Sequence, residues 1–364
     1  MLTKISILRT LPIWSVAVPI FAWIAYYLPI AQLGGIGTAI LVAFLIGSVL
    51  AAVHHAEVVA HKVGEPFGTL LLALAVTTIE VALIVSLMLT GGKGTEALAR
   101  DTVFAAVMII LSGMIGVCLL VGGAKYKQQD FSMESVKAAL IVLGAILVLT
   151  LILPNYTTSV AGPVYNKAQL IFVAIISLIL YFAFVLIQAV RHRDFFLPPE
   201  DDGNEEIHAD PPTLGVALTS GVILLICLGI VVLLAKALAP EIEDAVVSAG
   251  APKSLVGVII AAVVLLPEGL AAYRAAKKNR LQTSLNLALG SALASIGLTI
   301  PAVAVVSLIT GMTITLGIDT KSMLLLILTQ LTIMLSLGNG RTNILQGIVL
   351  LTIFAAYLFT IISP

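Results

Sequence analysis

Apolar residues in this chain gather in long continuous runs that short polar segments separate. Most runs are about 20 residues long, which is the length that an α-helix needs to cross roughly 30 Å of hydrocarbon. Because a bilayer offers no water to exposed backbone groups, runs of this length predict membrane-spanning helices. We expect eleven of them, near residues 11–30, 32–53, 67–90, 102–124, 136–154, 168–190, 213–236, 252–273, 283–310, 322–337 and 344–362.

The composition indicates a membrane protein rather than a soluble one. Of 364 residues, 60% are hydrophobic and only 10% are charged, whereas a soluble domain is roughly 25% charged. The net charge is zero, so no basic surface points to nucleic acid as a partner. Cys118 and Cys227 lie in apolar runs without a CxxC motif, so no disulfide framework is expected. The fold class that follows is an all-α integral membrane protein embedded in the lipid bilayer.

Lysine and arginine positions predict the orientation. The first apolar run continues to Ile30 without a small-residue cleavage site, so we expect a retained helix rather than a signal peptide. A cytoplasmic N-terminus places most basic residues inside, as the positive-inside rule requires. The inner segments then hold Lys4, Arg9, Lys62, Lys125, Lys127, Lys137, Arg191, Arg193, Arg274, Lys277, Lys278, Arg280 and Arg341, and the outer loops hold Lys93, Arg100, Lys167, Lys236, Lys253 and Lys321. We therefore expect the N-terminus inside and the C-terminus outside.

One long polar stretch, residues 191–213, divides the chain near its middle. It is rich in proline and acid, which is typical of a solvated, partly disordered linker. A regulatory cation sensor is the alternative, although EDDGNEE lacks the alternating ligand spacing of an EF-hand.

Apart from the first, the predicted helices form two sets of five, one on each side of this linker, which suggests an inverted repeat. An odd number of helices per set makes the second set enter the membrane in the opposite sense, and transport sites lie at such repeat interfaces. The expected organisation is an N-terminal helix in 1–30, a first five-helix repeat in 31–190, an acidic cytoplasmic linker in 191–212 and a second repeat in 213–364.

A glutamate lies inside an apolar run in each repeat, Glu80 in the first and Glu268 in the second. A carboxylate at membrane depth costs roughly 2.5–3.5 kcal/mol on insertion scales, so it is a functional candidate by default. Each occupies the second helix of its set. A buried, protonated carboxyl is the alternative. Pairing with a basic residue is not expected, since no predicted helix interior contains lysine or arginine.

Oxygen atoms near both glutamates suit a hard cation such as Ca²⁺ or Na⁺. Thr77 precedes Glu80 by three residues and so shares one helix face with it, and Thr78 is adjacent to Thr77. The alternative for Thr77 is a hydroxyl that bonds to its own helix. Pro267 lacks an N–H, so the carbonyl of Val263 loses its helical partner and could bind a cation. Gly269 lets the backbone bend at this point. The alternative is a simple proline kink without a role in cation binding. We expect Glu80 and Glu268 to bind the cation.

Protons and cations would compete for these carboxylates. Burial favours the protonated form, whereas a bound cation favours the charged form. Two carboxylates match the charge of one Ca²⁺ and would titrate as a coupled pair. The expected cargo is therefore a hard cation such as Ca²⁺ or Na⁺ together with H⁺, without a resident cofactor.

Small and polar residues in the neighbouring helices are secondary candidates. Small residues allow close helix contact, and we expect them to let the glutamates approach each other. Hydroxyl and amide groups there are either cation ligands or interhelical hydrogen-bonding groups. The small set is Gly113, Gly116, Gly290, Ala292, Ala294 and Gly297, and the polar set is Ser112, Asn286, Ser291 and Ser295.

A cluster of histidines and acids precedes the third predicted helix: His54, His55, Glu57, His61 and Glu65. No HExxH motif is present. We interpret the cluster as the cytoplasmic entrance of the ion pathway, with Glu57 and Glu65 along it; an ordinary solvated interface is the alternative.

The motifs around these residues resemble the CAX cation/proton exchangers of the calcium/cation antiporter superfamily. HHAEVVAHKVGEPFGTLLLALAVTTIE carries Glu57, Gly64, Glu65, Gly68 and Glu80 in the spacing of that family's first repeat. The family's second repeat is matched without a gap by LLPEGLAAYRAAKKNRLQTSLNLALGSALASIGLTIP, with Glu268, Lys278, Asn279, Gly290, Ser291 and Pro301 at its positions. A terminal motif of the family resembles NGRTNILQG (339–347).

Departures from the CAX pattern concern ion choice. Thr77 and Leu265 stand where the family has asparagine, Gly269 where it has histidine, and Asn339 and Gln346 where it has acids. These changes resemble the bacterial ChaA branch, whose members exchange calcium, sodium or potassium for protons. The resemblance therefore implies a protein of the bacterial cytoplasmic (inner) membrane. The resemblance implies an alternating-access antiporter and not an enzyme. A cation channel using the same glutamates is the alternative, and proton counterflow would distinguish the two.

Overall fold

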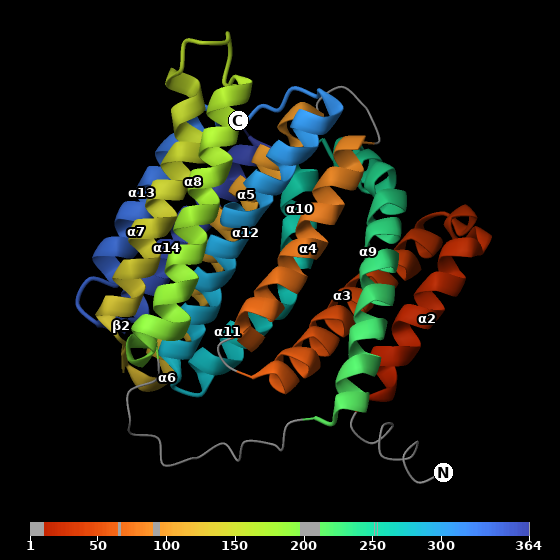
Figure 1. Ribbon diagram of the computed structural model, residues 1–364, viewed down its shortest axis with the longest axis horizontal. Coiled ribbons are helices and arrows are strands. Elements are labelled where there is room, and N and C mark those ends of the chain that lie inside the picture. The colour runs from red at the N-terminus through yellow and green to blue at the C-terminus, as the bar shows by residue number, and fades with distance from the viewer. Residues whose placement is uncertain are drawn as a thin grey trace. The chain divides into compact units, whose positions relative to one another are not determined.

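The computed structural model describes residues 11–64, 67–89, 95–196, 212–250, 252 and 254–363, and it is mainly helical (Figure 1). The chain separates into two compact units. Unit 1 comprises Met1–Leu87 and Asp201–Ala249, and unit 2 comprises Met88–Glu200 and Gly250–Pro364. The units are defined by contacts and the predicted repeats by symmetry, so the division into two repeats stays a prediction.

Unit 1 is built from helices that pack through small residues and backbone groups. Gly47 of α3 brings the helix backbone close to Val18 of α2, since an added Cβ would lie 2.7 Å from the valine Cγ1. Trp23 of α2 donates its Nε1–H to the carbonyl of Ile226 at 3.2 Å. The elements are α2 (Ile13–Tyr27), η1 (Pro29–Leu33), α3 (Gly35–Val63), most of α4 (Phe67–Leu89) and α9 (Leu214–Ser248).

Unit 2 contains the remaining helices and a short antiparallel ladder. In that ladder Gln129 of β1 lies opposite Thr342 of β2. The elements are η2 (Thr95–Ala97), α5 (Leu98–Met108), η3 (Ile109–Met114), α6 (Ile115–Tyr126), β1 (Gln128–Asp130), α7 (Met133–Leu147), η4 (Val148–Ile152), η5 (Leu153–Tyr156), α8 (Lys167–Leu186), η6 (Ile187–Arg191), η7 (Arg193–Phe196), α10 (Ser254–Val264), α11 (Leu266–Lys277), α12 (Leu281–Thr310), α13 (Thr320–Ser336), β2 (Arg341–Asn343) and α14 (Ile344–Ile362).

One continuous helix forms the centre of unit 2. It runs through α5, the π-helical η3 and α6, from Leu98 to Tyr126, and 83% of its most apolar stretch is buried. Its glycines contact α14: Gly116 lies against Leu351, and an added Cβ on Gly123 would meet the backbone of Ile344. These pairs show that α6 and α14 run antiparallel at close range, which small residues permit.

The helices fit an integral membrane protein. Within the described residues, seven helices are long and apolar enough to cross a bilayer, and the bent pair α10–α11 would be an eighth. Three shorter apolar helices, Ile13–Tyr27, Leu74–Leu89 and Thr320–Ser336, occupy further predicted positions. The prediction of a helical membrane protein is thereby confirmed, whereas the number of eleven spans stays a prediction.

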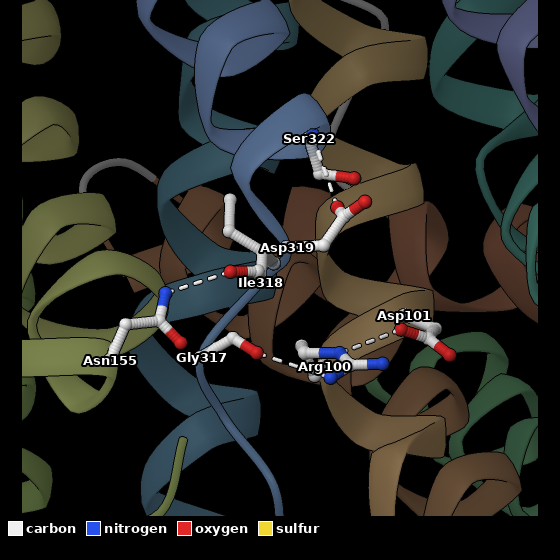
Figure 2. A network of polar contacts seen from close by, with 7 residues as sticks. All are labelled: Arg100, Asp101, Asn155, Gly317, Ile318, Asp319 and Ser322. Atoms are coloured by element: carbon white, nitrogen blue, oxygen red, sulfur yellow. Dashed lines mark hydrogen bonds and ion pairs between the residues drawn. The ribbon is translucent and has the colours of Figure 1, made fainter. Parts of the chain in front are cut away.

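A polar network holds Gly317, Ile318 and Asp319, at the end of the non-helical segment 311–319 of unit 2 (Figure 2). Arg100 donates to the carbonyl of Gly317 at 3.1 Å and pairs with Asp101 at 2.8 Å, while Asn155 donates to the carbonyl of Ile318 at 2.7 Å. Asp319 then caps α13, since its Oδ1 accepts from the Ser322 N–H at 3.0 Å. The network supplies partners for backbone groups that lie outside helices.

Candidate functional site

Glu80 lies on α4 in unit 1, with its side chain only 4% exposed. Thr77, one helical turn earlier, is equally buried at 4%. Residues three apart share one face of a helix. Both residues of the predicted pair therefore lie on the buried face of α4.

Thr78 differs from Thr77 in both exposure and bonding. It is exposed, and its hydroxyl donates to the carbonyl of Leu74 at 2.7 Å. This is the common bond of a threonine to its own helix. Of the two predicted threonines, Thr77 is the one that shares the buried face with Glu80.

Glu268 lies in unit 2, in the first turn of α11, immediately after a break in the helix. α10 and α11 are bent by 59° at Leu265. Pro267 is buried in the first turn of α11, a position where its missing N–H is tolerated, and the Val263 carbonyl cannot receive a helical bond from it. A carboxylate in the first turn is also favoured by the partial positive charge of a helix N-terminus.

Contacts along unit 2 give the depth of Glu268. Gly257 of α10 lies beside Thr102, Gly269 lies beside Met114, and the Lys277 carbonyl accepts a bond from Tyr126. The bent helix α10–α11 therefore runs parallel to the helix Leu98–Tyr126. Glu268, next to Gly269, lies near the level of Met114, which is close to the middle of that 29-residue helix. Both carboxylate oxygens of Glu268 are shielded from solvent.

The π-helical segment η3 lies near the level of Glu268 in unit 2. π-Bulges within α-helices are frequent at functional sites, and η3 places Ser112, Gly113 and Met114 there. Ser112 is fully buried and donates to the carbonyl of Met108 at 2.6 Å. The apolar pattern did not predict this π-helical segment, and a serine–glycine pair inside a long apolar run is the one signal that the sequence offers for it.

The small residues of unit 2 have neighbours of different kinds. A Cβ on Gly113 would lie 3.3 Å from the Phe354 ring of α14, and one on Gly297 would lie 3.0 Å from Tyr181 of α8. No atom lies within 4 Å of such a position on Gly290 among the described residues. In unit 2, Gly113 and Gly297 therefore accommodate aromatic side chains, and the approach of the two glutamates to each other stays a prediction.

The polar residues of α12 divide into two groups. Asn286 donates to the carbonyl of Phe196 at 2.7 Å and accepts from Gln282 at 2.7 Å, so both its polar atoms join a structural network. Ser295 is 2% exposed and Ser291 is half-buried. The serines lie along the helix that packs against α11.

The predicted entrance cluster is only partly described. Glu57 is exposed on α3, whereas Glu65 lies outside the described residues. His55 is fully buried, with its Nε2 3.1 Å from the Ser15 carbonyl oxygen, so it helps to hold α2 against α3. In the described part of the chain, no group of three or more His, Cys, Asp or Glu side chains could hold a metal ion. The acidic part of the linker, 197–211, also lies outside the description.

Comparisons with known proteins agree with this picture. The family model described as sodium/calcium exchanger protein matches residues 33–190 and 219–363. A relative from Sinorhizobium fredii, described as an ionic transporter, is 44% identical over 97% of each chain. The sodium-potassium/proton antiporter ChaA of Escherichia coli is 34% identical over 88% of this chain and 87% of its own. The crystal structure of the H⁺/Ca²⁺ exchanger CAX covers 98% of this chain and 88% of its own, with a TM-score of 0.71 at 14% identity.

Proposed function

The chain belongs to the sodium/calcium exchanger family, and we propose that it is a secondary active antiporter that exchanges a cation for protons across the membrane. The relative with 34% identity is a sodium-potassium/proton antiporter, and exchange requires no chemical catalysis by the protein. We propose Ca²⁺ as the exported cation, with Na⁺ and K⁺ as the alternatives.

The observation that carries the proposal is the setting of Glu268. Its carboxylate lies at a helix break, near the mid-depth of unit 2 and shielded from solvent. Broken helices in transporters supply carbonyl oxygens and helix ends to bound ions. Glu268 with the Val263 carbonyl supplies such oxygens in unit 2, and Ser291 is a further candidate ligand.

Glu80 is proposed as the matching group of the first repeat. Its burial beside Thr77 gives a carboxylate and a hydroxyl on one helix face, and these are ligand types that hard cations prefer. The family match falls in two blocks, 33–190 and 219–363, which supports one glutamate in each of two repeats.

The proposed mechanism is competition between cation and protons. A shielded carboxylate is stabilised as the neutral acid by proton binding or as the anion by a cation. A site that changes its accessible side only when loaded would carry protons one way and the cation the other. Binding would therefore couple the two flows by alternating access.

Transport by purified protein in liposomes tests this function. An imposed pH gradient should drive uptake of Ca²⁺, Na⁺ or K⁺, and an imposed cation gradient should move protons in return. Cation flux that proceeds without proton counterflow would instead indicate a channel. Comparing the three ions under one gradient identifies the preferred cargo.

Substitutions test the proposed ligands. Glu80→Gln and Glu268→Gln should each reduce exchange below detection while the protein remains folded, since glutamine retains the shape but cannot carry the charge. Glu134→Gln is the matched control, because Glu134 is an exposed glutamate in the first turn of α7. Unchanged exchange in either site variant would refute that ligand.

A further inference from the structure

We propose that the ends of α6 and α11 in unit 2 form a binding site for the phosphodiester headgroup of an anionic membrane lipid. The site centres on Lys125 and Lys277, which lie 152 residues apart in the chain. The proposed transport chemistry uses neither lysine.

One backbone carbonyl joins the two helix ends. Lys125 donates its Nζ to the carbonyl oxygen of Lys277 at 3.2 Å, and the Tyr126 hydroxyl donates to the same oxygen at 3.0 Å. Lys277 is the last residue of α11, so this carbonyl is one that the helix leaves without an internal partner. The partial negative charge of a helix C-terminus also attracts ammonium groups.

An aromatic ring accompanies each ammonium group. Lys125 Nζ lies 4.9 Å from the centre of the Tyr126 ring, and Lys277 Nζ lies 5.9 Å from that of Tyr273. A ring face attracts a cation without neutralising it. Tyrosines are enriched at the membrane–water boundary, so the pairs are suited to the depth of lipid headgroups.

The described residues around the two lysines carry positive charge, and no described carboxylate forms an ion pair with them. Arg274, Lys278 and Lys127 are exposed beside the two central lysines in sequence. None of these five basic groups forms an ion pair with a carboxylate in the described chain. The nearby Asp130 pairs with Arg341 at 3.0 Å. An anion bound here would therefore interact with basic groups that have no carboxylate partner among the described residues.

Apolar surface on the same helices favours a lipid over a free anion. Leu270 is 40% exposed and precedes Lys277 by seven residues, which is about two turns. Val117, 36% exposed, precedes Lys125 by about two turns as well. Both helices thus present apolar surface on the membrane side of a basic end. A lipid has a charged head and apolar chains that fit both parts, whereas inorganic phosphate would use only the basic part.

Native mass spectrometry of the full chain, titrated with phosphatidylglycerol, tests the site without depending on transport. The pair Lys125→Gln/Lys277→Gln should retain the lipid at least fivefold less tightly, since each lysine near anionic lipid contributes roughly fivefold. The control pair Lys167→Gln/Lys236→Gln removes the same charge from exposed lysines of α8 and α9 and should bind as the parent does. Lys125→Arg/Lys277→Arg should retain tight binding.

Equal retention in the glutamine pair and the control pair would overturn the proposal. Binding of inorganic phosphate as tight as that of phosphatidylglycerol would overturn the assignment to lipid. Circular dichroism and size-exclusion elution monitor folding. If the glutamine pair does not fold, the single variant Lys277→Gln provides the same comparison against Lys167→Gln.

Discussion

The terminal methyl group of Met114 lies 3.5 Å from the point where a Cβ atom on Gly269 would stand. Met114 closes the π-helical segment η3, and Gly269 follows Glu268. The contact therefore links the central helix of unit 2 to the backbone that positions the proposed cation-binding carboxylate.

A small and a large substitution at Gly269 should differ in their effect on exchange, because only the large side chain would clash with Met114. In Gly269→Ala the added carbon would stand at ordinary van der Waals distance from Met114, so exchange should stay within about twofold of the parent. Gly269→Leu overfills the contact at a cost of about 1–3 kcal/mol. The cation concentration for half-maximal exchange should then rise roughly tenfold, measured in liposomes. Equal exchange by the two variants would contradict the role of this contact.

Replacing Pro267 should straighten the break between α10 and α11. Pro267→Ala supplies an N–H for the Val263 carbonyl, so the helix can continue and one proposed ligand is withdrawn. We expect an unfolding temperature at or above that of the parent, with at least tenfold slower exchange. Pro240→Ala is the control, since Pro240 lies inside α9 of unit 1 and should leave exchange unchanged. Full exchange by Pro267→Ala would show that the break is not required.

A side chain added at Gly123, where the backbone contacts α14, should destabilise the fold. A Cβ on Gly123 would meet the backbone nitrogen and Cα of Ile344, which cannot move aside as a side chain can. Gly123→Ala should therefore lower the free energy of unfolding by about 1–3 kcal/mol. Gly221→Ala, with open space at its Cβ position, should cost nothing. Thermal unfolding in detergent measures both, and equal stability would argue against close packing of α6 on α14.

Tyr165 should make stability fall at high pH. Burial raises the pKa of its phenol to about 12, and the hydroxyl donates to the Leu149 carbonyl at 2.6 Å. Since the unfolded phenol has a pKa near 10, this stabilisation is complete below pH about 10 and lost as the pH rises towards 12. Tyr165→Phe should remove this part of the pH dependence. Denaturant unfolding at several alkaline pH values measures how the free energy of unfolding changes with pH. If this free energy falls with pH as steeply in the variant as in the parent, the prediction is refuted.

The sequence predicts the spanning segments well because hydrophobic length is a local property. The predicted helix 102–124 lies within the observed Leu98–Tyr126. The prediction of 213–236 stopped too early, since α9 continues to Ser248 through the more polar residues after Lys236. Apolar runs mark what the bilayer covers, and a helix can extend beyond it.

The finer site geometry depends on contacts that one sequence does not reveal. Glu80 and Glu268 stand out because charge is costly in hydrocarbon. The π-helical segment, the partner of Gly113 and the bond from Asn286 to Phe196 instead depend on residues far away in the chain. The β1–β2 ladder was missed as well, since three residues per strand leave no periodic pattern.

The pairing of α6 with α14 has a consequence for measuring motion. Contacts with α14 occur at Gly116 and Gly123 of α6 and at Gly113 of the preceding η3, and the ladder joins the ends of α6 and α14 through Gln128–Asp130 and Arg341–Asn343. With so many fixed points along its length, the pair should move as one rod throughout a transport cycle. Spin labels placed on α6 and α14 should therefore keep a constant separation, and this distance can serve as an internal ruler for the displacement of other helices.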